Sequence, residues 1–326
     1  MPVLEGSEGV TKVAMTGAAG FVGGHLLAQM AAAHSDWTVA APAGPDVASG
    51  LDVTDSEAVD AWIAREKPRI VVHLAAVAAV TAAVKDPRLA WQVNLDGTLN
   101  VVTSLQRHAP DAHLLFVSSA EVYGRSLIGG AVDEGALLEP VNPYAASKAA
   151  ADILVRQAGS AGLSATVVRP FNHTGAGQNA YFVVPAFARQ IARIEAGLQP
   201  PVFEVGSLDE ERDFLHVLDV TAAYLLLLER RGETQARDVF NVASGLPVRI
   251  GDLLERLLSR ARTTVEVRVD PARLRPTPIR SVVGDAGRLR ALGWTPRHTL
   301  DEALDAVLDE QRRLVNRSQG PADARS

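Results

Sequence analysis

The sequence predicts an α/β protein built on a doubly wound parallel sheet, with a smaller α/β lobe made mainly from the C-terminal part. Short apolar segments alternate with helical segments over roughly 160 residues from residue 11 onward, which is the order expected of βαβ units. Several of the apolar segments are continuous, as in parallel strands that are covered on both faces. After Pro170 the alternation becomes irregular, and this change indicates the second lobe.

The elements of the first part follow one another regularly. An apolar strand at residues 11–16 runs into a glycine turn, and residues 20–33 have the composition of a helix. The further segments that read as strands are residues 37–41, 69–76, 113–119 and 164–170. The further segments that read as helices are residues 55–66, 91–108 and 143–158.

The second part begins with a glycine-rich loop at residues 171–183. Strands are expected at residues 202–206 and 239–244, and helices at residues 184–197, 218–229, from 250 onward and at 300–315. A basic loop occupies residues 271–280. Residues 1–10 and 319–326 show no period, so we expect flexible termini.

The composition is that of a folded protein and excludes several functional classes. Of 326 residues, 47% are hydrophobic and 21% are charged, which allows a sizeable core. The net charge of −6 argues against nucleic acid or an anionic membrane as a partner, because neither meets a basic field. The absence of cysteine excludes disulfides, thiolate metal sites and cysteine nucleophiles. We expect a cytoplasmic protein, since no segment resembles a secretion signal or a membrane span. We also expect no metal site.

A glycine-rich segment, TGAAGFVG at residues 16–23, lies between the first strand and the first helix. Glycines there permit a tight turn and let backbone N–H groups approach a pyrophosphate at a helix N-terminus. Glycines also end strands for purely structural reasons, but the first βαβ turn is where this fold binds dinucleotides. The predicted contacts are Gly17, Ala19, Gly20, Phe21, Val22 and Gly23.

The second strand bears on the choice of cofactor. NAD-binding sheets of this kind carry an acid after that strand, which accepts the ribose 2′-hydroxyl. Here Pro42-Ala43-Gly44 follows and the first acid is Asp46, so NADP(H) is favoured and NAD(H) remains the alternative. Asp52 and Val53 suit an adenine contact, and Leu74, Ala75 and Ala76 suit a wall of small residues beside the cofactor, although a buried strand end would look the same.

Tyr144 and Lys148 are four residues apart in a predicted helix, hence on one face, one turn apart. A phenol of pKa ~10 is a poor proton carrier near neutrality, but a neighbouring cation lowers that pKa. We therefore expect Lys148 to make Tyr144 a usable acid or base. Ser119, at the end of an upstream strand, can hold a substrate oxygen beside Tyr144. Glu121 is either a carbanion-forming base or a solvated loop acid.

TGAAGFVG, HLAA, SSAEVYG and NPYAASK together resemble the extended short-chain dehydrogenase/reductases that modify nucleotide sugars on a Rossmann fold. Further segments, among them RPFNHTGAGQNAYFV, VGSLDEERDFLHVLDV and DPARLRP, are similar to those of GDP-6-deoxy-4-keto-D-mannose reductases. The GDP-mannose 4,6-dehydratases are close relatives of that group. The resemblance spans nearly the whole chain.

The resemblance implies roles for individual residues. Ser119, Tyr144 and Lys148 match the catalytic trio, and Glu121 matches the glutamate base of the dehydratases. Tyr144, Lys148, Asn94, Phe171 and His173 match cofactor-binding positions, which adds to the glycine-loop residues. The matching substrate-binding residues are Ser119, Asn172, Arg189, Arg212 and Arg275. Arginine suits such a role because its forked donors fit phosphate oxygens.

The function that the resemblance implies is a reductase. It would transfer a hydride from NAD(P)H to the C4 ketone of a nucleotide-linked 6-deoxy-4-keto-hexose, with the GDP sugar favoured and GDP-D-rhamnose as product. The alternatives are a 4,6-dehydratase that uses Glu121, a nucleotide-sugar epimerase, and a non-catalytic dinucleotide-binding redox sensor.

The resemblance also implies a domain division and an assembly. Residues 11–171 and 214–244 would form the NAD(P)-binding domain, and residues 172–213 and 245–318 the nucleotide-sugar lobe. We expect a homodimer, formed through the helices near residues 91–108 and 143–158.

Overall fold

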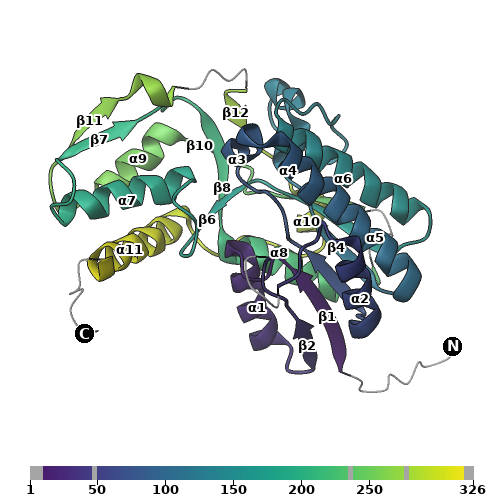
Figure 1. Ribbon diagram of the computed structural model, residues 1–326. Helices are drawn as coiled ribbons and strands as arrows, with labels where there is room; N and C mark the ends of the chain where they lie inside the picture. Colours follow the sequence, from purple (N-terminus) through teal and green to yellow (C-terminus); the bar gives the residue numbers. More distant parts are fainter. Residues whose placement is uncertain (1–9, 46–49, 234–237, 275–278, 319–326) are drawn as a thin grey trace, which may run out of the picture. The chain divides into compact units, whose positions relative to one another are not determined.

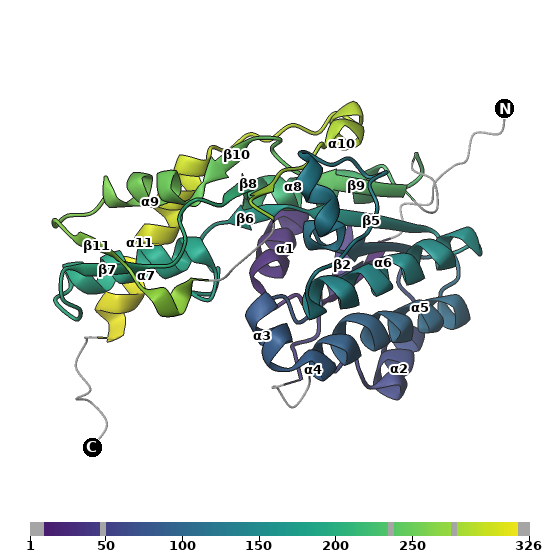
Figure 2. The ribbon, with the colours of Figure 1, turned by 90° about the horizontal axis from the view of Figure 1, so that it is seen from above.

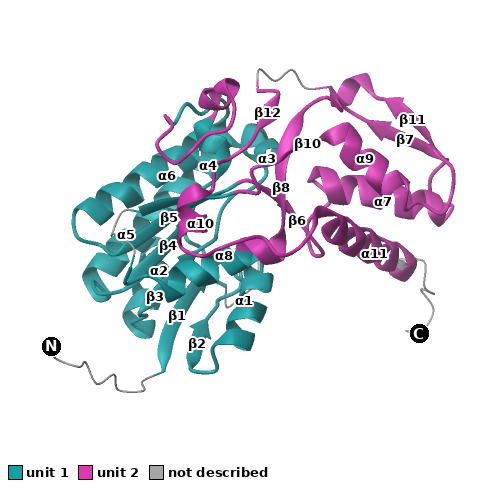
Figure 3. Ribbon diagram, turned by 180° about the vertical axis from the view of Figure 1, so that it is seen from behind, with its two compact units in different colours: residues 1–123, 138–170, 221–242 teal, residues 124–137, 171–220, 243–326 magenta. Residues whose placement is uncertain are grey.

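The computed structural model describes residues 10–45, 50–233, 238–274 and 279–318. The chain forms two compact units, coloured separately in Figure 3. Unit 1 comprises residues 1–123, 138–170 and 221–242, and unit 2 comprises residues 124–137, 171–220 and 243–326. Arg275 and, apart from Val10, the two termini predicted to be flexible lie outside the described residues.

Unit 1 is built on a six-stranded sheet in the order β2-β1-β3-β4-β5-β9, and all neighbouring strands run parallel; Figure 3 labels the first five of these strands. The strands are β1 (Thr11–Thr16), β2 (Trp37–Ala40), β3 (Ile70–His73), β4 (His113–Val117), β5 (Ala165–Pro170) and β9 (Asp238–Val242). From β1 the chain passes to β2 on one side and to β3 on the other. The strand order thus reverses at β1, and sheets of this kind bind ligands beyond the carboxyl ends of the strands at such a point. The predicted Rossmann-type sheet is confirmed.

Helices cover both faces of this sheet (Figures 1 and 2). One face carries α2 (Ser56–Glu66), α5 (Gly97–His108) and α6 (Pro143–Ser160), and the other carries α1 (Phe21–Ala33) and residues 221–229 of α8 (Val217–Glu229). The helix predicted at residues 91–108 is divided. The short helices α3 (Val80–Lys85) and α4 (Pro87–Trp91) lead into a π-helical turn, η1 (Gln92–Asp96), before α5 begins. Among the described residues, no helix combines the length and the apolar character that crossing a bilayer requires.

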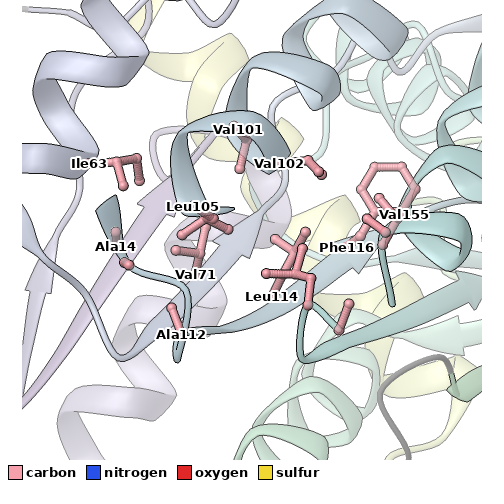
Figure 4. Packing of buried hydrophobic residues seen from close by; sticks show 14 of the residues in the cluster. Ala14, Ile63, Val71, Val101, Val102, Leu105, Ala112, Leu114, Phe116 and Val155 are labelled. Atoms are coloured by element: carbon pink, nitrogen blue, oxygen red, sulfur yellow. The ribbon is translucent and has the colours of Figure 1, made fainter. Parts of the chain in front are cut away.

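The core of unit 1 lies between the sheet and the layer formed by α2, α5 and α6. Strand residues such as Val71 and Leu114 pack against Ile63, Leu105 and Val155 from these helices (Figure 4). Burial of such side chains contributes about 1.5–3 kcal/mol each. The continuous apolar strands seen in the sequence are therefore explained by a sheet that is covered on both faces.

Unit 2 is mixed. Its larger sheet centres on β8 (Glu211–His216), which pairs in parallel with β6 (Asn172–Thr174) and β12 (Ser281–Val282) and antiparallel with β10 (Pro247–Arg249). A second, two-stranded parallel sheet joins β7 (Val202–Val205) and β11 (Glu266–Val269). The helical elements are α7 (Val183–Glu195), α9 (Ile250–Leu258), α10 (Gly287–Ala291), α11 (Leu300–Ser318) and the 3₁₀ turns η3 (Arg125–Gly129) and η4 (Pro271–Arg273). Phe187, Leu254 and Leu304 are among the buried residues that hold α7, α9 and α11 together.

Two features of unit 2 were not expected from the sequence. Residues 124–137 were assigned to the dinucleotide-binding domain, but the structure groups them with unit 2. The reason is backbone pairing, because the Val132 N–H bonds the Val283 carbonyl at 3.2 Å and the Asp285 N–H bonds the Val132 carbonyl at 2.8 Å. Strand β8 was missed because its charged residues hide the apolar pattern. Its Asp213 is nevertheless buried, with Ser244 and Gly245 N–H groups donating to its carboxylate.

Candidate active site

The glycine loop after β1 turns tightly against the end of β3. Gly17 has a φ of +69°, and a Cβ there would lie 2.6 Å from the backbone nitrogen of Ala75. A Cβ on Gly23 would lie 2.5 Å from the Gly17 carbonyl oxygen. Neither position accepts a side chain without movement of the backbone, so both glycines are required by close approach.

The loop ends at Gly20, which is the N-cap residue of α1 and whose N–H bonds the Gly17 carbonyl at 3.0 Å. Gly20 has no side chain to cap the helix, and the first turn of α1 holds no acidic residue. A helix N-terminus of this kind attracts an anion. The loop thus fits the pyrophosphate of a dinucleotide. Of the remaining predicted residues, Ala19 is exposed and Phe21 and Val22 are half-buried.

The residues predicted beside the adenine have mixed environments. Asp52 uses its Oδ1 to accept hydrogen bonds from the Thr54 N–H and hydroxyl, at 2.9 and 2.8 Å. Val53 is buried and packs closely on Gly97, where an added Cβ would lie 2.7 Å from the Val53 side chain. Asp46, the first acid after β2, is outside the described residues. Contacts of these residues with a cofactor stay predictions.

The helix α6 carries the Tyr144–Lys148 pair, and its start is well defined. Asn142 is the N-cap residue, with its Oδ1 accepting from the Ala145 N–H at 2.8 Å, and Pro143 occupies the first helical position. Both features are typical of a helix N-terminus. Tyr144 and Lys148 are both buried, with Tyr144 8% exposed.

Ser119 and Glu121 approach this helix from the segment after β4. The Ser119 hydroxyl is hydrogen-bonded to Tyr144, and Ser119 Oγ also accepts the Glu121 N–H at 3.2 Å. The Asn142 amide donates to Glu121 Oε2 at 3.4 Å. Unit 1 therefore brings Ser119, Glu121 and Tyr144 close together, with Lys148 one turn farther along α6, while their catalytic roles stay predictions. Asn142, which both caps α6 and holds Glu121, was missed, although an Asn-Pro pair before a helix is a recognisable start signal.

The pKa of Tyr144 differs from the expectation. Burial raises the pKa of Tyr144 to about 12, the hydrogen bond from Ser119 opposes this, and the Glu121 carboxylate raises it further. Lys148 does not lower the pKa of the phenol, because its ammonium is directed to the Val117 carbonyl and lies 4.6 Å from the centroid of the Phe116 ring. Burial lowers the pKa of Lys148 itself to about 7, against the opposing field of Asp152. The expected activation of Tyr144 by Lys148 is thus wrong for the free protein.

Asn94 lies in the π-helical turn, and both the oxygen and the nitrogen of its side chain form hydrogen bonds within the protein. Its Oδ1 accepts the Val77 N–H at 2.8 Å, and its amide donates to Ser147 Oγ at 2.9 Å. Ser147 lies between Tyr144 and Lys148 on α6 and in turn donates to the Tyr144 carbonyl at 2.9 Å. The structure therefore gives Asn94 a position beside α6, while a direct cofactor contact stays a prediction.

Phe171, Asn172 and His173 belong to unit 2. Phe171 is buried, and a Cβ on Gly284 would lie 2.3 Å from its ring. The His173 ring is hydrogen-bonded through Nδ1 to the Phe171 carbonyl at 2.9 Å, and burial lowers its pKa. Asn172 is half-buried in β6.

The predicted phosphate-binding arginines differ in their partners. Arg189 is exposed on α7 and has no ion pair or side-chain hydrogen bond with any described residue. Arg212 donates from Nη1 to the carbonyls of Glu211 at 2.7 Å and Arg280 at 3.3 Å. Arg275 cannot be assigned a place, since it lies outside the described residues.

Comparisons with known proteins show the family of this chain. Residues 13–243 match the model of the NAD dependent epimerase/dehydratase family. A GDP-6-deoxy-D-mannose reductase of Pseudomonas aeruginosa is 41% identical over 305 residues, which cover 92% of this chain and 97% of the relative. A GDP-6-deoxy-D-talose 4-dehydrogenase of Aggregatibacter actinomycetemcomitans is 27% identical, over 94% of this chain and 99% of the relative.

Among solved structures, that of RMD from Pseudomonas aeruginosa complexed with NADPH is similar throughout. It shares 38% identity and a TM-score of 0.83, covering 93% of this chain and 99% of that chain. The family match spans most of the sheet of unit 1, the glycine loop and the Tyr144–Lys148 helix. From the family model and the relative above 40% identity together, this chain belongs to the NAD dependent epimerase/dehydratase family.

Proposed function

We propose that this chain is a nucleotide-sugar 4-ketoreductase, which uses NADPH to convert GDP-4-keto-6-deoxy-D-mannose to GDP-D-rhamnose. The observation that carries the proposal is the position of the buried Tyr144 phenol, at the start of α6 and beside the Ser119 hydroxyl. The phenol keeps its proton at neutral pH, and because a phenol is a stronger acid than the sugar alcohol formed from the alkoxide, Tyr144 can still protonate that alkoxide. The 41% identity with a GDP-6-deoxy-D-mannose reductase supports the substrate.

The residues of unit 1 would divide the work as follows. When bound, the dinucleotide supplies the hydride. Tyr144 would donate its phenolic proton to the C4 oxygen of the sugar, and the Ser119 hydroxyl would hydrogen-bond the same oxygen. Lys148, anchored to β4, would hold the ribose on the nicotinamide side. The glycine loop would bind the pyrophosphate through backbone N–H groups.

The cofactor preference rests on two supports. The end of β2 is followed by Pro42, Ala43 and Gly44 rather than by an acid, so nothing in that tripeptide repels a 2′-phosphate. A similar solved structure is complexed with NADPH. NADH is the alternative, and comparison of the two dissociation constants decides between them.

We further propose that unit 2 binds the nucleotide part of the sugar substrate. Arg189 supports this role, because it is exposed and lacks a partner among the described residues. A pyrophosphate brings negative charge that a free guanidinium can pair with in a bidentate manner. Asn172, Arg212 and Arg275 remain candidates for the same ligand.

A homodimer is also proposed, through the layer of α5 and α6, which lie side by side in Figure 2. Leu99 of α5 is 42% exposed and Ile153 of α6 is 53% exposed. Apolar side chains of this size on neighbouring helices suit burial against a second copy. Light scattering of the wild type and of Ile153→Arg tests this, with a dimer and a monomer as the expected results.

The 4,6-dehydratase is the second candidate, and one observation favours it. Glu121 is held by Asn142 close enough to Tyr144 for its charge to raise the phenol pKa, so a carboxylate base lies next to the proposed acid. Such an enzyme would use Glu121 to remove a proton from the sugar.

One pair of assays separates the two candidates. The purified protein is given GDP-4-keto-6-deoxy-D-mannose with NADPH, and absorbance at 340 nm follows oxidation of the cofactor. In parallel it is given GDP-mannose without NADPH, and formation of a keto sugar is followed by NMR. The reductase predicts turnover in the first assay only, and Glu121→Gln retains that turnover. Keto-sugar formation that disappears in Glu121→Gln would identify a dehydratase instead.

A further inference from the structure

A continuous hydrogen-bonded network of buried polar side chains runs through unit 1, from the glycine loop to α6. Its members are Thr16, His73, Thr98, Asn94 and Ser147, and each is at most 2% exposed. Thr16 directly precedes Gly17 of the loop, and Ser147 lies between Tyr144 and Lys148. The network therefore connects the two ends of the proposed dinucleotide site.

The hydrogen bonds at its centre have one consistent direction. The Thr98 hydroxyl gives its single hydrogen to the Asn94 carbonyl at 2.7 Å. Its contact with His73 Nε2, at 3.1 Å, must then be a bond that the imidazole donates. His73 Nδ1 is therefore the acceptor, and it accepts from the Thr16 hydroxyl at 2.7 Å. Thr16 Oγ1 in turn accepts the Ala75 N–H at 3.3 Å.

The imidazole stays neutral in this arrangement. Burial lowers the pKa of His73 to about 3, and the nearby charge of Lys148 lowers it as well. The ring thus holds the single Nε2–H tautomer over the whole physiological range. Such a ring is a rigid connector with one donor and one acceptor, rather than a group that changes charge near neutrality.

The other half of the network reaches the first turn of α6. Asn94 donates to Ser147 at 2.9 Å, and Ser147 donates to the Tyr144 carbonyl at 2.9 Å. The π-helical turn that holds Asn94 ends where the Gly97 N–H bonds the Gln92 carbonyl. This turn places the Asn94 carbonyl within reach of the Thr98 hydroxyl and its amide within reach of α6. Irregular helical turns of this type recur at functional sites.

We propose that His73 and Thr98 are positioning residues that set the glycine loop and the start of α6 at the separation a whole dinucleotide requires. Neither residue touches the cofactor in this proposal. They act because a ligand that bridges two binding subsites gains affinity only when both subsites are held at the right distance. The inference rests on the proposed use of a dinucleotide, but on no particular sugar.

The test compares a whole dinucleotide with a fragment that occupies only the loop end. The probes are NADPH and 2′-phospho-ADP-ribose, or NADH and ADP-ribose if the wild type binds NADH more tightly. Thr98→Val removes the hydroxyl with little change of shape, and Thr98→Ser is the matched control that keeps it. Dissociation constants are measured by fluorescence and calorimetry, well below the melting temperature, without any sugar substrate.

We expect Thr98→Val to weaken dinucleotide binding about tenfold, the range for one lost buried hydrogen bond with a partner left unsatisfied. Its affinity for the fragment should stay within about twofold of wild type, and Thr98→Ser should match wild type for both probes. His73→Asn provides a second variant if Thr98→Val does not fold. An asparagine reaches the Nδ1 position and so keeps Thr16, but it does not reach Thr98.

Two results would overturn the inference. An equal loss of affinity for both probes would mean that the network only supports the loop. Unchanged binding of both probes in a folded variant would mean that it only supports the fold. Since these measurements need no sugar, they are independent of the reductase assay, whose failure would contradict the proposed function alone.

Discussion

The ammonium of Lys148 lies 4.6 Å from the centroid of the Phe116 ring and donates a hydrogen bond to the Val117 carbonyl. Phe116 and Val117 end β4, and Ser119 follows two residues later. The contact therefore fastens α6 to β4 at the level where Tyr144 meets Ser119. It also directs the positive charge of Lys148 toward the strand, which is why the phenol is not made more acidic in the free protein.

The first prediction concerns the proposed proton donor. Tyr144→Phe removes the phenolic hydroxyl that Ser119 contacts, and we expect kcat/KM for reduction to fall by about 100-fold or more, the usual contribution of general acid catalysis. The dissociation constant for NADPH should change little, because the aromatic ring remains. Stopped-flow absorbance and NADPH fluorescence measure the two quantities. Near wild-type turnover in this variant would remove Tyr144 from the mechanism.

The second prediction concerns the pH dependence of stability. Lys148 has a pKa of about 7 in the folded protein, compared with 10.5 for an unperturbed lysine. Between these pH values the unfolded chain binds more protons than the folded one, so this group makes stability rise with pH. Below pH 7 Lys148 is protonated in both the folded and the unfolded state, and burial of its ammonium then lowers the free energy of unfolding by the full amount.

Lys148→Met removes that effect. We expect the variant to be more stable than wild type at pH 7, and the difference to shrink by about 1.4 kcal/mol per pH unit toward pH 10. Urea unfolding at pH 7, 8 and 9 gives the free energies. A difference that stays constant over this range would show that Lys148 does not titrate there. The same variant should lose reductase activity, because the lysine is proposed to hold the cofactor ribose.

The third prediction concerns the glycine loop. Gly17→Ala places a Cβ 2.6 Å from the Ala75 nitrogen at a φ of +69°, so the loop must shift. We expect dinucleotide affinity to fall by at least about tenfold and the free energy of unfolding by about 1–3 kcal/mol.

Gly24→Ala is the matched control, since nothing lies within 4 Å of an added Cβ at this exposed position of α1. It should raise stability by about 0.5–1 kcal/mol, because alanine is the better helix residue, and leave binding unchanged. Equal binding by both variants would contradict the assignment of Gly17 to the pyrophosphate.

The fourth prediction concerns a buried hydroxyl. The Tyr224 hydroxyl in α8 is fully buried and has no hydrogen-bond partner among the described residues, and burial raises its pKa. An unpartnered buried hydroxyl destabilises a fold by about 1–2 kcal/mol. Tyr224→Phe should therefore increase the melting temperature and leave turnover intact.

Tyr123 provides the matched comparison. Its hydroxyl donates to Asn241 Oδ1 at 2.7 Å and accepts from Arg169 Nη1 at 3.0 Å. Tyr123→Phe removes both of these buried hydrogen bonds and should lower the free energy of unfolding by about 1–3 kcal/mol. Thermal unfolding of the two variants measures the contrast, and a loss of stability in Tyr224→Phe would reveal an unrecognised partner of that hydroxyl.

Local pattern was enough to predict the sheet of unit 1 and to select the residues proposed for its site. Continuous apolar strands, the glycine turn after residue 16 and the helical spacing of Tyr144 and Lys148 are all short-range features. Each depends on one segment alone, and the structure brings Ser119, Glu121 and Tyr144 close together.

Only the tertiary structure decided how those groups are charged and held. The direction of the Lys148 ammonium depends on Phe116 and Val117, and the position of Asn94 depends on Val77 and Ser147. Likewise, the chain positions of His73 and Thr98 do not indicate that they meet. A pKa and a hydrogen-bond partner depend on burial and on residues distant along the chain, whereas a sequence period reports only which side of its own segment is covered.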